Sequence, residues 1–153
     1  MEERKIKDRP LQVWLERITK ANNPRVVDLC DLARKSYMHP DLLGSVSIKD
    51  VLPAVWQGNE KLRQRAEFMS YNQTGEDGQS LNPYHTLPAL RIGSREESVR
   101  EGTGAMRMYQ DLLQQAETAT SSAHAARLKL LRQYCQLDTA AMVIIWRHWA
   151  GAY

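Results

Sequence analysis

The chain has 153 residues, 42% of them hydrophobic and 25% charged, which are ordinary values for a globular domain and argue against a chain that is disordered throughout. Its net charge of +3 and its pI near 8.9 permit an anionic partner without requiring one. No apolar run approaches the ~20 residues of a membrane-spanning helix, and the charged N-terminus lacks the apolar core of a signal peptide. We therefore expect a soluble, cytoplasmic protein without a membrane partner.

The N-terminal part predicts a charged tail and two helices. Residues 1–9 are the tail, and Pro10 suits the first turn of a helix. The apolar positions that follow repeat at three and four residues, the period of one helix face: Leu11, Trp14, Leu15 and Ile18. Asn23 as cap and Pro24 in the first turn begin a second helix, which is broadly apolar and in which Cys30 is expected to be a small core residue.

Two further helices are predicted before a long loop. Ser47 caps a short helix that is limited by Pro53. Asn59 caps another helix that ends near Tyr71. Residues 72–88 contain two glycines and two prolines, and a loop of this length is either functional or a mobile connector. The connector is the simpler interpretation.

The C-terminal half contains the clearest helical patterns. Ser94 and Glu97 fit a capping box and predict a short helix that stops at Gly102. Segment 104–149 shows three apolar-periodic runs, which predict three helices, the last of them capped by Asp138. No segment alternates with period two over a convincing length, so no sheet is predicted.

These elements predict an all-α fold for residues 1–153. The expected architecture is a single domain, a compact bundle of about six or seven helices with one long mobile loop at about 72–88. Segment 104–149 is its best-defined part.

Patterns typical of enzymes and metal sites are missing from the sequence. The four histidines are widely spread, and no C-x-x-C or H-x-x-x-H spacing supports a metal site. Nucleophile and phosphate-loop patterns are also missing. Cys135, like Cys30, lies on an apolar face and is expected in the core rather than in a disulfide. We therefore expect no catalytic residue, no metal and no cofactor.

Basic residues gather on the predicted outer faces of the last helices. A solvated face is the simpler interpretation of any one arginine. Taken together, Arg107, Lys129 and Arg132 project from successive helices with few acids between them. A stripe of this kind contacts phosphates without reading sequence. The charge pattern alone adds five further candidates for nucleic-acid contact: Lys61, Arg63, Arg65, Arg95 and Arg100.

Trp146 and Trp149 share one face of the last predicted helix, since they are three residues apart. They are either a stacking platform for bases or part of the core or of a partner interface. The apolar neighbours Met142 and Ile145 favour core packing or a partner interface.

Several of these motifs together resemble the small subunit of type I-E CRISPR surveillance complexes (Cascade). The resemblance rests on R-M-Y-Q-D-L-L from Arg107, R-L-K-L-L from Arg127, L-D at Leu137 and the closing W-x-x-W of Trp146 and Trp149. Upstream, segment 65–69 and the later G-Q-S-L are similar to that family's helix, loop and G-x-S-L step. The chain departs from the family at three positions: Asn82, Gln114 and Gln115.

The resemblance implies a non-catalytic, all-α subunit that sits in copies along a ribonucleoprotein. Its partners would be other subunits, including a second copy of itself, together with guide RNA and target DNA. It would brace the guide–target hybrid and hold the displaced strand electrostatically, while base pairing by the guide reads the sequence. Arg107 and Lys129 match motif positions and would contact phosphates.

A rival hypothesis is a helical adaptor or chaperone-like module, as in secretion systems or plasmid and phage accessory proteins, that binds protein through Trp146 and Trp149. A regulator that reads duplex DNA is a third, but it needs a recognition helix that we cannot identify. Salt separates the first two hypotheses, because phosphate contacts weaken steeply as salt rises.

Overall fold

The computed structural model describes residues 8–19, 26–114 and 122–152. The chain divides into two compact units, residues 1–37 and residues 38–153. The expected cap and restart at Asn23 and Pro24, and the polar linker near residue 118, lie outside the described residues.

The described residues of the first unit form two helices, α1 (Arg9–Thr19) and α2 (Leu29–Ser36). The start of α1 agrees with the expectation from Pro10, and the Asp8 carboxylate accepts the Leu11 backbone N–H at 3.1 Å. Helix α2 begins later than predicted, at Leu29. The reason is Asp28, whose carboxylate accepts the backbone N–H groups of Cys30 and Asp31 at 2.8 and 3.2 Å and caps the helix there.

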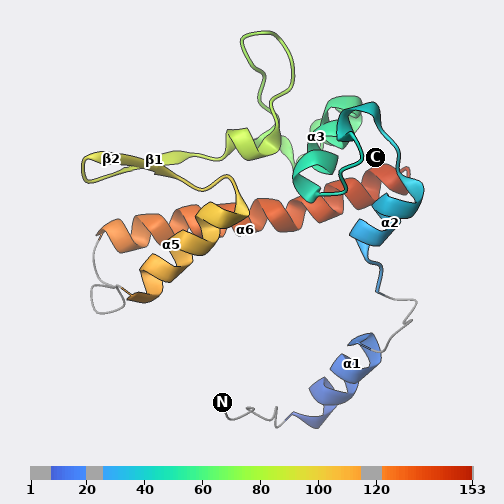
Figure 1. Cartoon of the computed structure of the whole chain (residues 1–153), viewed down its shortest axis with the longest axis horizontal. Helices are drawn as coiled ribbons and strands as arrows, with labels where there is room; N and C mark the ends of the chain where they lie inside the picture. The colour runs from blue at the N-terminus through green and yellow to red at the C-terminus, as the bar shows by residue number, and fades with distance from the viewer. Residues whose placement is uncertain (1–7, 20–25, 115–121, 153) are drawn as a thin grey trace. The chain divides into compact units, whose positions relative to one another are not determined.

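The second unit is built along one long helix, α6 (Ser122–Trp149). Helices α3 (Ile48–Gly58) and α5 (Gly102–Gln114) pack against it, as Figure 1 shows. Their shared face forms the core, in which the largest fully buried side chains are Leu52, Trp56, Leu62, Leu137 and Ile144. The remaining helical pieces are short: α4 (Glu60–Arg63), η1 (Pro40–Leu42), η2 (Met69–Tyr71) and η3 (Pro83–Thr86).

Helix α6 runs through Asp138 without a break, so the prediction that Asp138 caps a separate last helix is wrong. A capping aspartate turns its carboxylate to the backbone N–H groups of its own helix. The Asp138 carboxylate instead accepts hydrogen bonds from Lys49 and Tyr84, which belong to other elements. Asp138 therefore does not cap a new helix, and α6 continues through it.

A two-stranded antiparallel hairpin replaces the helix predicted from Ser94 and Glu97. Strands β1 (Ala89–Ile92) and β2 (Arg95–Ser98) pair with Ile92 opposite Arg95, which leaves Gly93 and Ser94 as a two-residue turn. Gly93 has φ +63°, the positive value that a type II′ hairpin turn needs at its first position. The protein is therefore mostly helical but not all-α.

The segment between α3 and the hairpin also differs from the prediction. Ser47 caps α3 as expected, and Pro53 lies within that short helix. The next helix ends at Arg63, far short of Tyr71, and turns follow it. Within the expected loop at 72–88, η3 packs Pro83 and Tyr84 into the core. The η3 part of that loop is therefore a structural part of the fold.

Both cysteines are exposed, so the expectation that Cys30 and Cys135 are core residues is wrong. Cys135 lies next to the buried Tyr134, and the 100° step per residue turns it away from the core face of α6.

Candidate functional site

Four side chains from three elements meet beside α6 in a polar cluster. The Lys49 ammonium donates to Asp138 Oδ1 at 2.9 Å, and the Tyr84 hydroxyl donates to the same oxygen at 2.6 Å. The Lys49 Nζ also lies 3.3 Å from the ring centroid of Tyr84 and 4.4 Å from that of Tyr134, within range of a cation–π interaction. The cluster therefore joins α3, η3 and α6.

Partial burial shifts the pKa values of this cluster. Burial lowers the pKa of Lys49, and the attraction of Asp138 and Glu101 offsets only part of this effect. Burial, followed by the Asp138 hydrogen bond, raises the pKa of Tyr84 well above its usual value. The same two causes raise the pKa of Tyr134 to about 12. Both tyrosines therefore keep their hydroxyl protons at neutral pH.

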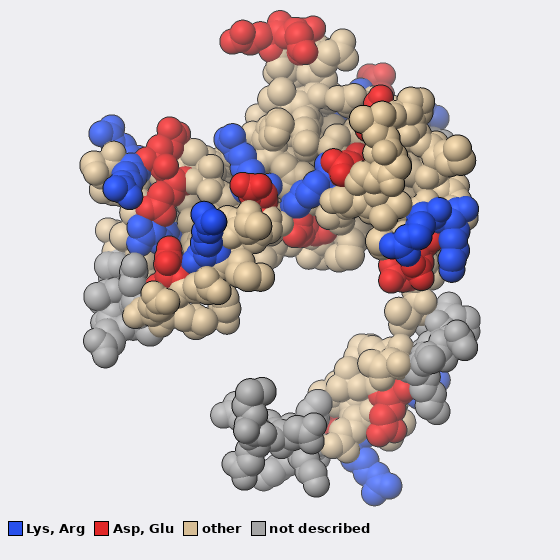
Figure 2. Space-filling view, viewed as in Figure 1, with Lys and Arg blue, Asp and Glu red and all other residues tan. Residues whose placement is uncertain are grey.

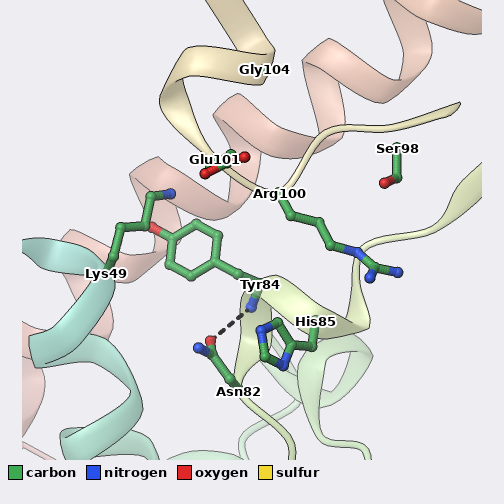
Figure 3. Close-up of a pocket in the computed structure, with 8 residues that line it drawn as sticks. All are labelled: Lys49, Asn82, Tyr84, His85, Ser98, Arg100, Glu101 and Gly104. Atoms are coloured by element: carbon green, nitrogen blue, oxygen red, sulfur yellow. Dashed lines mark hydrogen bonds between the residues drawn. The ribbon is translucent and has the colours of Figure 1, made fainter.

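A pocket of about 500 Å³ opens next to the cluster (Figure 3). Helix α3, the η3 turn, the end of β2 and the start of α5 contribute its walls. The lining residues are Lys49, Asn82, Tyr84, His85, Ser98, Arg100, Glu101 and Gly104. The volume falls in the range of roughly 300–1,000 Å³ that is typical of small-molecule sites.

Arg100 is the group in this pocket that can bind an anion. Its guanidinium is always charged, whereas the charge of Lys49 is balanced by Asp138, and Glu101 is the acid in the lining. Helix α5 begins at Gly102, so its N-terminal N–H groups add partial positive charge. Arg100 has five N–H donors, and its hydrogen bond to the Leu87 carbonyl, at 3.4 Å, uses one of them. The guanidinium can therefore also bind a phosphate or carboxylate.

Arg100 is the predicted nucleic-acid contact that lines this pocket. Two of the other candidates have structural partners instead. Arg63 donates to the backbone carbonyls of Trp56 and Gln57 at 2.5 and 2.8 Å, where α3 ends. Arg65 pairs with Glu67 at 2.7 Å. Arg63 and Arg65 therefore stabilise the turns after α3.

The three residues of the predicted basic stripe are all exposed, but they do not share one side of the molecule. Arg127 faces the hairpin, because its guanidinium binds Glu97 at 2.7 and 2.9 Å. Lys129 is two positions further along α6, and residues so spaced point to opposite sides of a helix. Arg132, five positions from Arg127, lies about 140° away and so on the Lys129 side.

Arg107, on α5, lies on the Arg127 side of the α5–α6 pair and so away from Lys129. It is one turn before Asp111 on the same face of α5, and the Asp111 carboxylate acts electrostatically on Arg127. Figure 2 shows positive and negative side chains interspersed over the visible face of the unit formed by residues 38–153. The remaining candidates, Lys61 on α4 and Arg95 on β2, are exposed.

Lys49, Tyr84 and the Glu97–Arg127 pair were not anticipated from the sequence. Lys49 and Asp138 are 89 residues apart, and Tyr84 falls in a segment that reads as a loop. The single local signal was Asp138 itself, an acid within a strongly apolar helical pattern, which fits a cap equally well.

Apolar side chains remain exposed on both helices of the α5–α6 pair. On α5, Met106, Tyr109 and Leu113 are exposed at helical spacing. On α6, Trp146 is 46% exposed beside Met142 and Val143, whereas Trp149 is half-buried. Trp146 is therefore not a core residue.

No helix among the described residues is long and apolar enough to cross a membrane. The described residues also contain no group of three or more histidine, cysteine or acidic side chains placed to hold a metal ion. Comparisons with protein-family models, with curated protein sequences and with solved structures find no match to the chain.

Proposed function

We propose that this protein is a non-catalytic helical subunit of a nucleic-acid-binding complex. The observation that supports it best is Arg100, whose side chain lines a pocket at the start of α5. A guanidinium near a helix N-terminus suits the phosphates of a nucleic-acid backbone. Such contacts bind without reading bases, which is the division of labour expected of an accessory subunit.

In its finer form, the proposal is a small subunit of a CRISPR-type effector in the cytoplasm. The motif run from Arg107 to Trp149 and the mostly helical fold support this form. The subunit would then contact guide RNA and target DNA beside other subunits, including a second copy of itself. Lys129 and Arg132, which share one side of α6, are available for a second set of phosphate contacts.

The test is binding of labelled RNA and DNA to the full chain at about 50 and about 200 mM salt. We expect affinity to fall steeply with salt, and Arg100→Glu to weaken binding at least tenfold. The double change Lys129→Glu with Arg132→Glu tests the side of α6 separately. Binding that is insensitive to salt and to all three changes contradicts the proposal.

The exposed apolar residues favour a second candidate, a protein-binding adaptor. Met142, Val143 and Trp146 form a contiguous apolar face on α6 that a partner helix can cover. Under this function, purification from the native host recovers protein partners without RNA, and Trp146→Ala removes them. Recovery of a short, uniform guide-like RNA with several subunits supports the CRISPR form instead.

A further inference from the structure

The size of the pocket restricts the form of nucleic acid that can enter it. A volume of about 500 Å³ is in the range of small-molecule sites, so it can admit one nucleotide but not a double helix. A duplex keeps its bases stacked and offers only its backbone to the pocket mouth. A single strand can turn one nucleotide out of its stack and place it inside.

The lining supplies a different group for each part of a nucleotide. Arg100 matches the phosphate, because a planar guanidinium binds phosphate oxygens in pairs. His85 offers an exposed imidazole ring on which a base can stack. Both side chains line the same pocket, in which Figure 3 shows the His85 ring near Asn82 and the Arg100 guanidinium toward the side of Ser98.

Two polar groups add hydrogen bonds for the sugar or the base edge. The Asn82 Oδ1 accepts the Tyr84 backbone N–H at 3.0 Å, so its amide still offers N–H donors. The Ser98 hydroxyl, at the end of β2, can both donate and accept. Lys49 is held by Asp138, which balances its charge.

We propose that this pocket binds one nucleotide of single-stranded RNA or DNA, with the phosphate on Arg100 and the base against His85. The assignment rests on the proposed nucleic-acid-binding function and adds the place of contact: one pocket that takes one unstacked nucleotide of a single strand. Single-stranded RNA and DNA share the chemistry that this pocket would recognise, which is one phosphate beside one unstacked base.

The experiment compares a labelled oligouridylate, an oligothymidylate and a duplex of equal length by fluorescence anisotropy with the full chain. We expect either single strand to bind at least tenfold more tightly than the duplex. His85→Ala should lower single-strand affinity about fivefold or more, in line with the stacking of one base, and leave duplex affinity unchanged. A nucleoside monophosphate should compete better than inorganic phosphate.

Arg95→Gln is the matched control for Arg100→Gln, since Arg95 is exposed on the same hairpin but outside the pocket. The pocket assignment predicts a larger loss of single-strand affinity for Arg100→Gln. Equal losses for the two variants, or equal binding of single strand and duplex, overturn it while leaving the proposed function standing. A chain that binds no form of nucleic acid overturns the proposed function as well.

Discussion

Lys49 shows how one charged side chain can link distant parts of this fold. Its ammonium is held by one carboxylate and two aromatic rings, and its side chain is 30% exposed. Partial burial removes some of the water around this charge, which is why the pKa of Lys49 is lowered although Asp138 attracts it. The net stabilisation is therefore modest, and its main effect is to orient α3 against α6.

Lys49→Met should lower the free energy of unfolding by about 1–2 kcal/mol. The change leaves Asp138 with Tyr84 as its donor and removes a charge-assisted hydrogen bond that is only partly screened by solvent. Urea unfolding followed by circular dichroism measures the loss. Lys129→Met, on an exposed position of α6, is the control and should shift stability by less than about 0.5 kcal/mol.

The raised tyrosine pKa values predict sensitivity to alkali. Tyr134 has a pKa of about 12 in the folded state against 10.0 unfolded, so the folded state holds its proton more tightly. Its contribution to stability is complete below pH 10 and is lost as the pH rises toward 12. Tyr134→Phe should therefore flatten the fall in stability between pH 10 and 12. Unfolding curves across this range test it, and an unchanged slope contradicts it.

The hairpin turn needs a residue that tolerates a positive φ. At Gly93 the backbone has φ +63°, where an added Cβ meets no neighbouring atom within 4 Å but is strained by the backbone itself. Gly93→Ala should destabilise the protein by about 1–2 kcal/mol. Thermal melts measure this loss. Gly104→Ala, in the first turn of α5 and with only ordinary contacts, is the control and should be neutral or stabilising.

The Glu97–Arg127 pair attaches the hairpin to α6. Arg127 holds the pKa of Glu97 below its usual value of 4.5, so the pair stabilises the fold above that pH and its effect is lost as the pH falls through the folded pKa. Glu97→Gln should lower hydrogen-exchange protection in β1 and β2 at pH 7. Glu96→Gln is the matched control, because neighbouring strand residues point to opposite faces. Equal effects of both changes contradict this role.

The buried core of the protein lies almost wholly in the second unit. Among the described residues of the first unit, only Ala33 is buried, and Trp14 of α1 is 55% exposed. We therefore expect residues 38–153 to fold without residues 1–37. A chain that starts at Met38 should melt cooperatively within a few degrees of the full chain. A broad, non-cooperative melt would show that α1 and α2 are needed for the core.

Local pattern alone determined most of the helical character of this protein. Apolar periodicity predicts α1, α3 and α5, and it predicts the helical residues of α6 but divides them at Asp138. The Ser47 cap is also predicted, because a cap acts on residues only two or three positions away. The charge pattern predicts Arg100 as a contact residue, but its place in the pocket lining depends on tertiary packing. Helix faces and caps depend on near neighbours, so they can be predicted from the order of residues.

Tertiary structure alone decided the rest. The sequence predicts Asp138 as a cap, but its carboxylate accepts a hydrogen bond from Lys49, which is 89 residues away in the chain. The sequence predicts a helix where the hairpin lies. The hairpin forms because strand pairing and the attachment of Glu97 to Arg127 outweigh the weak local preference for a helix. The sequence predicts one stripe of basic residues, but the packing of α5 on α6 places Arg107 and Lys129 on different sides. Long-range partners have no local signature, because the chain brings them together only when the core forms.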